Sequence, residues 1–396
     1  MSCFVFIVLG QIISLFGNAA LRFALPLVLL RQSGSAALYG TVTALAMFPA
    51  LAGMLVGGAL ADRCRKARLM AGLDLGTAAL CAGAALAVHA APAVPFTLLV
   101  LGCLYAIQGL YQPAVRASLP LMLPDSQLER GNAVIQLVDT VDELLGPLLG
   151  GVLLARCGLR GLLGLCALCF FGSAMLELHI RLPEDPPVRT TLSLRGIGSD
   201  LQESFRFLAR QPAVLQLTAT MAAVNLLEIP AITLGVPVLV VQYLHRSDAA
   251  LGLAQAVLSA GGLAGGLLAG TVFSRRPLHS GTPLLLFIGG ACAALGGMLL
   301  LPTFAYSGIL ALGFAVMAAA VVFNVWFFAK LQREIPQTQL GRATACTTVL
   351  ACLTQPIGQA AYGGLFEHFS ACPARVLLGA GVISVLVLLL LHRRSA

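Results

Sequence analysis

Long apolar blocks separated by short polar breaks run through this sequence from one end to the other. The hydrocarbon core of a bilayer is about 30 Å thick, and an α-helix crosses it with about 20 apolar residues. Only 10% of the 396 residues are charged, whereas a soluble domain carries about 25%. The chain is therefore predicted to be a polytopic, all-α membrane protein embedded in a lipid bilayer.

Twelve transmembrane helices are expected from the apolar blocks. The first block has no basic segment before it and no small-residue cleavage site after it, so it is interpreted as a retained span. The approximate ranges are 4–30, 39–61, 69–89, 95–117, 133–155, 160–181, 213–242, 250–273, 281–301, 304–329, 343–368 and 374–392.

The basic residues predict the orientation of these spans. With a cytoplasmic N-terminus, eighteen of the 24 Lys and Arg residues lie in segments on the cytoplasmic side, five lie on the other side, and Arg22 lies within a span. Because cytoplasmic loops carry an excess of Lys and Arg, both termini are expected in the cytoplasm. The same distribution explains the net charge of +8 without nucleic acid, since no aromatic residues are interleaved with the basic ones.

The longest polar segment divides the chain into two predicted bundles. Residues 182–212 begin with helix-breaking prolines and continue with apolar residues at helical spacing, which predicts a cytoplasmic linker with an amphipathic helix. The flanking ranges, 1–181 and 213–396, are then an N-terminal and a C-terminal six-helix bundle.

A gap-free shift of 212 residues aligns the two predicted bundles. The matches include Pro and Arg as well as the abundant Gly and Ala. Two similar six-helix halves are a known plan of secondary transporters, which bind substrate between the halves near the middle of the bilayer. The matched positions are Pro124, Leu128, Arg130 and Ala133 with Pro336, Leu340, Arg342 and Ala345, and Gly40, Ala52, Gly53, Gly58 and Arg63 with Gly252, Ala264, Gly265, Gly270 and Arg275.

Three motifs carry a resemblance to a known family. They are Gly58-Ala-Leu-Ala-Asp62-Arg63-Cys-Arg65-Lys66, Gln112-Pro113-Ala114-Val-Arg116, and Gly146-Pro147-Leu-Leu-Gly150-Gly151. On these residues the whole chain resembles a major facilitator superfamily transporter, and within it the branch that exports macrolides, siderophores and drugs. The resemblance implies the major facilitator fold and transport by alternating access. The first motif has Arg65 where the family usually has Gly.

The resemblance also implies roles for two of these motifs. In the first motif, Asp62 would face the start of the eleventh helix and close the cytoplasmic side, because a carboxylate is favourable at a helix N-terminus. The alternative is that Gly58, Asp62, Arg63, Arg65 and Lys66 only set the orientation of the loop. Arg116, near the cytoplasmic end of the fourth span, is expected to pair with Asp62, Asp74 or the 125–129 loop.

The third motif is similar to the antiporter motif of the fifth span. Pro147 beside Gly146 allows a bend in the helix, and Gly150 with Gly151 allows another helix to approach closely. The alternative is a packing face with no role in the direction of transport.

Charged residues inside the predicted spans are the strongest signal of a site, because a charge at bilayer depth is costly and usually faces a cavity or a partner. Asp139, Asp142 and Glu143 share one helical face through their i, i+3, i+4 spacing. Arg22 lies at similar depth in the first span, so we expect it to pair with Asp142 or Glu143. The surplus of acid would leave one carboxyl neutral and so provide a proton site. A fixed structural network is the alternative.

Glu228 is a second candidate for proton or substrate binding, because it is the lone acid of the seventh span. The alternative is a hydrogen-bonded packing residue near Pro230. Asn18, Asn225 and Asn324 are polar candidates for the lining of the central cavity.

We therefore predict a transporter, not an enzyme, that exports a small lipophilic or amphipathic molecule by proton antiport. Its expected partners are the substrate, protons and the bilayer, with no cofactor and no metal, and we expect a monomer in a bacterial inner membrane. An importer or uniporter of the same fold is the first alternative, because fold alone does not set direction. A transport-inactive membrane sensor or scaffold is the second.

Overall fold

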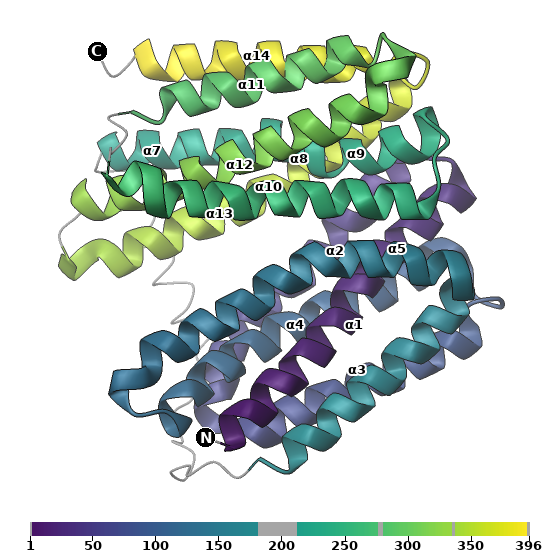
Figure 1. Ribbon diagram of the computed structural model, residues 1–396, viewed down its shortest axis with the longest axis vertical. Helices are drawn as coiled ribbons and strands as arrows, with labels where there is room; N and C mark the ends of the chain where they lie inside the picture. The colour runs from purple at the N-terminus through teal and green to yellow at the C-terminus, as the bar shows by residue number, and fades with distance from the viewer. Residues whose placement is uncertain (1, 181–211, 276–279, 335–336, 394–396) are drawn as a thin grey trace. The chain divides into compact units, whose positions relative to one another are not determined.

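Helices make up the whole regular structure of the residues that the computed structural model describes, which are 2–180, 212–275, 280–334 and 337–393 (Figure 1). No strand occurs in these ranges. The helices before the predicted linker are α1 (Ser2–Ser33), α2 (Ala36–Arg63), α3 (Lys66–Ala87), α4 (Ala93–Met122) and α5 (Asp125–Leu178).

The helix α5 contains a break that divides it into two. Gly158 has φ 65° and ψ 177°, so the backbone leaves the helical region at this residue, and Gly adopts a positive φ without steric cost. The two parts match the spans predicted over 133–155 and 160–181. The turn between those spans is therefore confirmed at Gly158.

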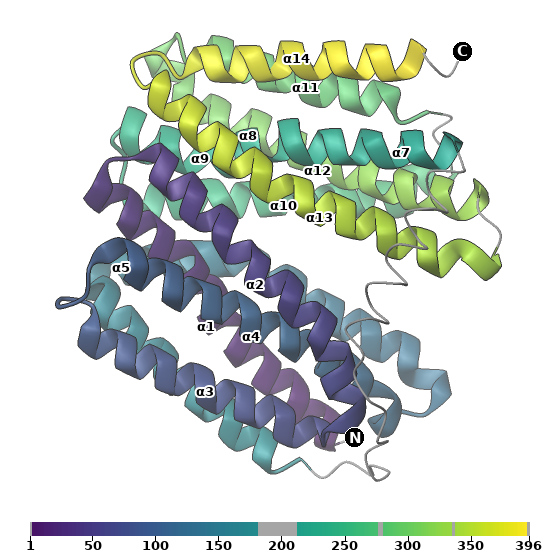
Figure 2. The ribbon, with the colours of Figure 1, turned by 180° about the vertical axis from the view of Figure 1, so that it is seen from behind.

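The second half of the chain begins with an irregular helical segment. It comprises α7 (Pro212–Ala223), the π-helix η1 (Val224–Glu228), α8 (Ile229–Thr233), α9 (Gly235–Val238) and a second π-helix, η2 (Leu239–Tyr243). The following helices are α10 (Asp248–Arg275), α11 (Thr282–Met298), α12 (Pro302–Glu334), α13 (Gln337–His368) and α14 (Ala374–Arg393). In both ribbon views α11 and α14 run side by side (Figures 1 and 2).

Membrane-spanning length is reached by eight helical stretches among the described residues, one of which covers both parts of α5. Two further apolar helices are shorter, Thr282–Met298 and Ala374–Val387. The predicted total of twelve spans stays a prediction. The linker and its amphipathic helix, predicted over 182–212, lie almost entirely outside the described residues, which resume at Pro212.

Close contacts divide the described residues into two units whose limits cut through two helices. The first unit falls within residues 1–34, 45–191 and 247–256, and the second within 35–44, 192–246 and 257–396. The first turns of α2 thus belong with the second unit, and the first turns of α10 belong with the first. The sequence-based bundles, 1–181 and 213–396, stay a prediction.

Close helix contacts repeat with the same shift of 212 residues that aligns the sequence. A Cβ added to Gly53 of α2 would lie 2.5 Å from the carbonyl oxygen of Ala106, and one added to Gly265 of α10 would lie 2.3 Å from that of Ala318. Distances this short require glycine. The repeat therefore holds in the packing of α2 on α4 and of α10 on α12, and not only in the composition.

A second pair of repeated contacts lies at the exchanged helix ends. Gly151 approaches the carbonyl oxygen of Asp248 in the first unit, and Gly363 approaches that of Ala36 in the second, at added-Cβ distances of 2.7 and 2.8 Å. Each residue of one contact is 212 positions from its counterpart in the other. The internal repeat predicted from the sequence is confirmed at these positions.

Each unit has its own apolar core. In the first unit, buried residues of α1, α3, α4 and α5 cluster around Met70, Tyr111 and Leu119. In the second, residues of α7, η1, α11 and α12 cluster around Val224, Phe323 and Phe327. Phe323 is 212 positions from Tyr111, so the two residues are equivalent in the repeat. Each places an aromatic ring in the core of its unit, and the Tyr111 ring of the first unit carries a hydroxyl that Phe323 lacks.

Candidate transport site

Glu228 lies inside the second unit, near the middle of the span Val214–Tyr243. Its residue is only 2% exposed, and it closes the π-helix η1. A π-helical turn inside an α-helix is rare and is frequent at functional sites. Asn225, on the same turn, donates a hydrogen bond from Nδ2 to the carbonyl oxygen of Met221 at 3.0 Å.

The irregular backbone around Glu228 has a clear cause. Pro230 lacks an N–H group and cannot continue the regular helical bonding, and Gly358 of α13 packs against Leu226 and Pro230. The hydroxyl of Tyr362, also on α13, donates to the carbonyl oxygen of Leu227 at 2.6 Å. A neighbouring helix therefore satisfies a backbone carbonyl next to the site.

The Glu228 carboxylate itself is poorly compensated. Neither oxygen has a hydrogen-bond partner of good geometry among the described residues, and Ser384 of α14 is a polar side chain close enough to act on it. The single ion pair found in the described part of the chain is Arg31–Asp248, so no basic group there neutralises Glu228. A buried carboxylate without a counter-charge is expensive in a membrane, which makes Glu228 the strongest sequence-derived candidate.

The acids of α5 have different surroundings. Asp139 is half-buried and accepts hydrogen bonds from the Nε2 atoms of Gln11 and Gln112 at 3.4 and 3.5 Å. Asp142 is buried, with 9% of its surface exposed. The side chain of Glu143 lies outside the description. The structure thus gives Asp139 amide partners from α1 and α4.

The alternative partner of Arg22, Glu143, has its side chain outside the description, and no ion pair between Arg22 and Asp142 is found among the described residues. The guanidinium carbon of Arg22 lies 5.1 Å from the centre of the Tyr105 ring instead, a cation–π arrangement that offsets part of the cost of a buried charge. Asn18, one turn earlier on α1, is buried, and its Oδ1 atom has no hydrogen-bond partner in the described ranges.

Two buried acids of the first unit were not identified as site candidates from the sequence, although Asp74 was named as a possible partner of Arg116. Asp74 of α3 is 1% exposed and Glu177 of α5 is 0% exposed. Both lie within about two helical turns of a predicted span end, where an acid is usually assigned to the loop. Their similar depth could have identified them from the sequence. Because α3 and the second part of α5 run in opposite directions, a residue near the start of one lies level with a residue near the end of the other. Asp74 accepts a hydrogen bond from the Ser14 hydroxyl at 2.8 Å, and no ion pair between Asp74 and Arg116 is found among the described residues.

The loop motif lies at the junction of α2 and α3. The helix α2 extends through Gly58 and Asp62 to Arg63, but the side chains of these three residues lie outside the description. Arg65 is exposed and extended, with φ −64° and ψ 113°, and Lys66 begins α3. The gating role of this loop stays a prediction.

Arg116 is exposed near the end of α4. Its charge acts on Asp139, which was not among its predicted partners.

The glycines of the antiporter-like motif bring α5 against two other helices. An added Cβ at Gly146 would lie 2.3 Å from the Cβ of Ala19, and one at Gly150 would lie 3.0 Å from the Cα of Ala20. Gly151 meets the start of α10, as described above. The predicted close approach is confirmed, whereas a role of this motif, including Pro147, in the direction of transport stays a prediction.

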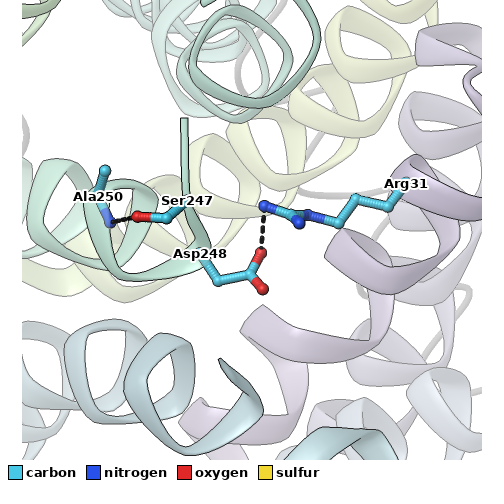
Figure 3. Close-up of polar contacts among 4 residues, drawn as sticks. All are labelled: Arg31, Ser247, Asp248 and Ala250. Atoms are coloured by element: carbon cyan, nitrogen blue, oxygen red, sulfur yellow. Dashed lines mark hydrogen bonds and ion pairs between the residues drawn. The ribbon is translucent and has the colours of Figure 1, made fainter. Parts of the chain in front are cut away.

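The start of α10 is also held by charge. Arg31, at the end of α1, forms an ion pair with Asp248 at 2.6 Å (Figure 3). The Oγ atom of Ser247 accepts a hydrogen bond from the N–H group of Ala250 at 3.3 Å and caps the first turn (Figure 3).

In the second unit, Glu367 of α13 holds the start of α2 in the same way. It accepts hydrogen bonds from the hydroxyl of Ser35 and from the N–H group of Ala37.

The last polar candidate, Asn324 of α12, has an exposed side chain.

Comparison with known proteins assigns the family. The sequence model of the Major Facilitator Superfamily matches residues 7–359. Among curated relatives, the enterobactin exporter EntS of Citrobacter koseri is 28% identical, over 97% of this chain and 90% of the relative. The enterobactin exporter EntS of Salmonella typhimurium is 27% identical over the same shares.

Solved structures agree on the fold. A bacterial homologue of the iron transporter ferroportin has a TM-score of 0.75 at 17% identity, over 98% of each chain. A D-xylose–proton symporter has a TM-score of 0.68 at 17% identity, over 98% of this chain and 96% of the other.

The chain belongs to the major facilitator superfamily. It is a multi-pass α-helical membrane protein and a transporter rather than an enzyme, as the sequence predicted.

Proposed function

We propose that this transporter exports a small amphipathic molecule from a bacterial cell across the inner membrane and is driven by proton antiport. Export is supported by the curated relatives, which are named enterobactin exporters and match along almost the whole chain. Enterobactin is therefore the first compound to test. Few polar residues occur in each span, which favours a substrate with substantial apolar surface.

The burial of Glu228 is the observation that carries proton coupling. The carboxyl lies at mid-span, 2% exposed, with no hydrogen bond and no ion pair among the described residues. A charge at this depth costs several kcal/mol or is neutralised. Binding a proton removes the charge, so the two protonation states differ strongly in the environment that they prefer. That difference is what a coupled transporter needs to link proton movement to a change of state.

Other candidates are assigned roles within this proposal. Asp139 and Asp142 on α5 form a polar face toward substrate, supported by the amide contacts of Asp139. The 58–66 loop, with Asp62, closes the cytoplasmic side, as the family resemblance implies. Both termini are proposed to be cytoplasmic, supported by the eighteen-to-five distribution of basic residues.

The test is substrate flux into liposomes that contain the purified protein and an imposed pH gradient. An antiporter accumulates enterobactin in acid-inside liposomes, because protons leaving the lumen drive substrate into it. A symporter accumulates it in alkaline-inside liposomes. A uniporter is indifferent to the gradient. Accumulation with alkaline-inside liposomes, or indifference, would contradict the proposal.

Glu228→Gln isolates the coupling group. We expect this variant to lose gradient-driven accumulation and to keep exchange of labelled for unlabelled substrate at equal pH, since the amide has the same shape but carries no titratable proton. Glu367→Gln is the matched control, because Glu367 is an exposed acid on α13. Full gradient-driven accumulation by Glu228→Gln would exclude Glu228 as the coupling residue.

A further inference from the structure

A buried polar cluster joins four helix segments of the first unit. Ser14 of α1 donates a hydrogen bond to Oδ1 of Asp74 at 2.8 Å, and the hydroxyl of Tyr111 on α4 donates to Oε1 of Glu177 at 2.5 Å. Ser173, one turn before Glu177, lies beside Asp74 and donates to the carbonyl oxygen of Gly10 at 2.9 Å. The two carboxylates are close enough to repel each other.

Each acid of this cluster uses one oxygen and leaves the other open. Oδ2 of Asp74 and Oε2 of Glu177 are buried and have no hydrogen-bond partner among the described residues. Both residues are at least 99% buried. The donors of the cluster are hydroxyls and bring no positive charge. The two open oxygens are therefore acceptors in need of a proton.

In the part of the chain that the structure describes, no counter-charge is found on the pair from the helices packed around it. In the described residues α1 contributes Ser14, α4 contributes Tyr111, and α3 and α5 contribute the acids themselves with Ser173. The one ion pair of the described chain, Arg31–Asp248, does not involve either acid. Two buried carboxylates in this setting cannot both ionise cheaply.

A small cavity lies beside Asp74 and Tyr111 of the cluster. It is lined by Ser14, Asn18, Asp74, Thr77, Gln108 and Tyr111, among others. Its volume is about 10 Å³, close to the minimum that one water needs. The buried Oδ1 atom of Asn18, which lines this cavity, has no partner among the described residues. A water molecule there would reach polar groups on α1, α3 and α4.

The second unit shows that the repeat packs without such a cluster. Phe323 takes the place of Tyr111 in α12 and is buried in an apolar core. The helices α11 and α14 pack on each other as α3 packs on the second part of α5, and they contain no acidic residue. Since apolar residues commonly fill such positions at equal or better stability, packing alone does not explain the acids of the first unit.

We propose that Asp74 and Glu177 together hold one exchangeable proton, and that they form a proton-binding site of the first unit, separate from Glu228. The proton resides on Oδ2 of Asp74 or Oε2 of Glu177. The Ser14 and Tyr111 hydroxyls orient the opposite oxygens, and water in the cavity delivers and removes the proton. This inference rests on the proposed proton coupling, to which it adds a second site.

Infrared difference spectroscopy of the whole protein in lipid tests the site without any substrate. The C=O stretch of a protonated carboxyl is separate from the bands of carboxylates. We expect the wild type to show such a band that disappears as the pH is raised. Asp74→Asn and Glu177→Gln should each shift the pH at which it disappears, because the remaining carboxyl no longer faces a second carboxylate, and the double substitution should remove it. Tyr111→Phe should shift its frequency and leave it present.

The same spectra include a control variant at another buried acid, Glu228. Glu228→Gln should leave this band in place and remove a different one, and thermal unfolding should show that each variant is folded. If single substitutions leave the band unchanged, or if the pair is ionised throughout, the inference is wrong. A dependence of the band on Na⁺ concentration at fixed pH would assign the site to sodium and also overturn it.

Flux measurements separate this inference from the proposed function. If wild-type flux ignores the pH gradient while the infrared band shifts in both single variants and is lost in the double variant, the proton site stands and proton antiport fails. If flux follows the gradient in the wild type, in Asp74→Asn and in Glu177→Gln, and the band is unchanged in all variants, antiport stands and this site fails.

Discussion

The two units bury carboxyl groups in different ways. In the first unit, Asp74 and Glu177 each receive a hydrogen bond from a hydroxyl, Ser14 or Tyr111. In the second, Glu228 receives none among the described residues and ends a π-helical turn. The first arrangement holds acids within a fixed polar cluster, whereas the second leaves one acid in an irregular segment of helix. The comparison teaches that one repeated architecture can carry two chemically different acid sites.

The largest contrast should appear when each acid is replaced by an apolar residue. Glu177→Leu leaves the buried Tyr111 hydroxyl without its acceptor, which costs about 1–3 kcal/mol. Glu228→Leu removes a carboxyl whose oxygens make no geometrically good hydrogen bond among the described residues, with only Ser384 close to it, so we expect unchanged or increased stability. Thermal unfolding in one detergent compares both variants with the wild type. Equal destabilisation of the two would show that Glu228 is hydrogen-bonded as firmly as Glu177.

A smaller effect is expected from exchanging the two aromatic residues that the repeat relates. Phe323→Tyr places a hydroxyl in the apolar core of the second unit and should cost about 1–3 kcal/mol. Tyr111→Phe removes one hydrogen bond and should cost about 0.5–1.5 kcal/mol. The loss from Tyr111→Phe should disappear in a Glu177→Leu background, which a double-mutant cycle measures. A loss that persists there would mean that the hydroxyl has another partner.

The smallest effect concerns the ion pair at the start of α10. Arg31→Gln should lower stability by about 0.2–1 kcal/mol, because the arginine is 40% exposed and solvent screens the pair. The loss should shrink at high salt. Glu367→Gln tests the contacts of a carboxylate with neutral donors at the start of α2, and we expect its effect to depend less on salt than that of Arg31→Gln. Salt-independent loss in Arg31→Gln would show that the ion pair is not the source of the effect.

Much of the fold could be predicted from sequence because it follows from local composition. The apolar blocks predicted the helices, the polar breaks predicted their ends, and the matches at a shift of 212 predicted the internal repeat. The structure then shows that the matched residues Gly53 and Gly265 make equivalent contacts, with Ala106 and Ala318. Glycines at positions of close helix contact can be recognised in the sequence because a larger residue does not fit there. The count of twelve spans and the roles of the site residues remain predictions.

The candidate site was only partly predictable. Glu228 was identified by its lone charge in an apolar span, and the structure adds the π-helical turn and the Tyr362 contact. Arg22 contacts the Tyr105 ring and forms no ion pair with Asp142 among the described residues, while its pairing with Glu143 stays a prediction. Asp74 and Glu177 were not predicted as site residues because each lies near a predicted span end, and sequence does not show which side of a helix faces its neighbours.

The sequence by itself determined that the chain is helical, membrane-embedded and internally repeated, since hydropathy and glycine placement are properties of single segments. Only the tertiary structure decided which buried acids meet hydroxyls and which meet none. Asp74 and Glu177 are 103 positions apart, and they lie in one cluster because α1, α3, α4 and the second part of α5 pack together. The partners of a side chain in a bundle depend on helix rotation and depth, and the packing of the other helices sets both.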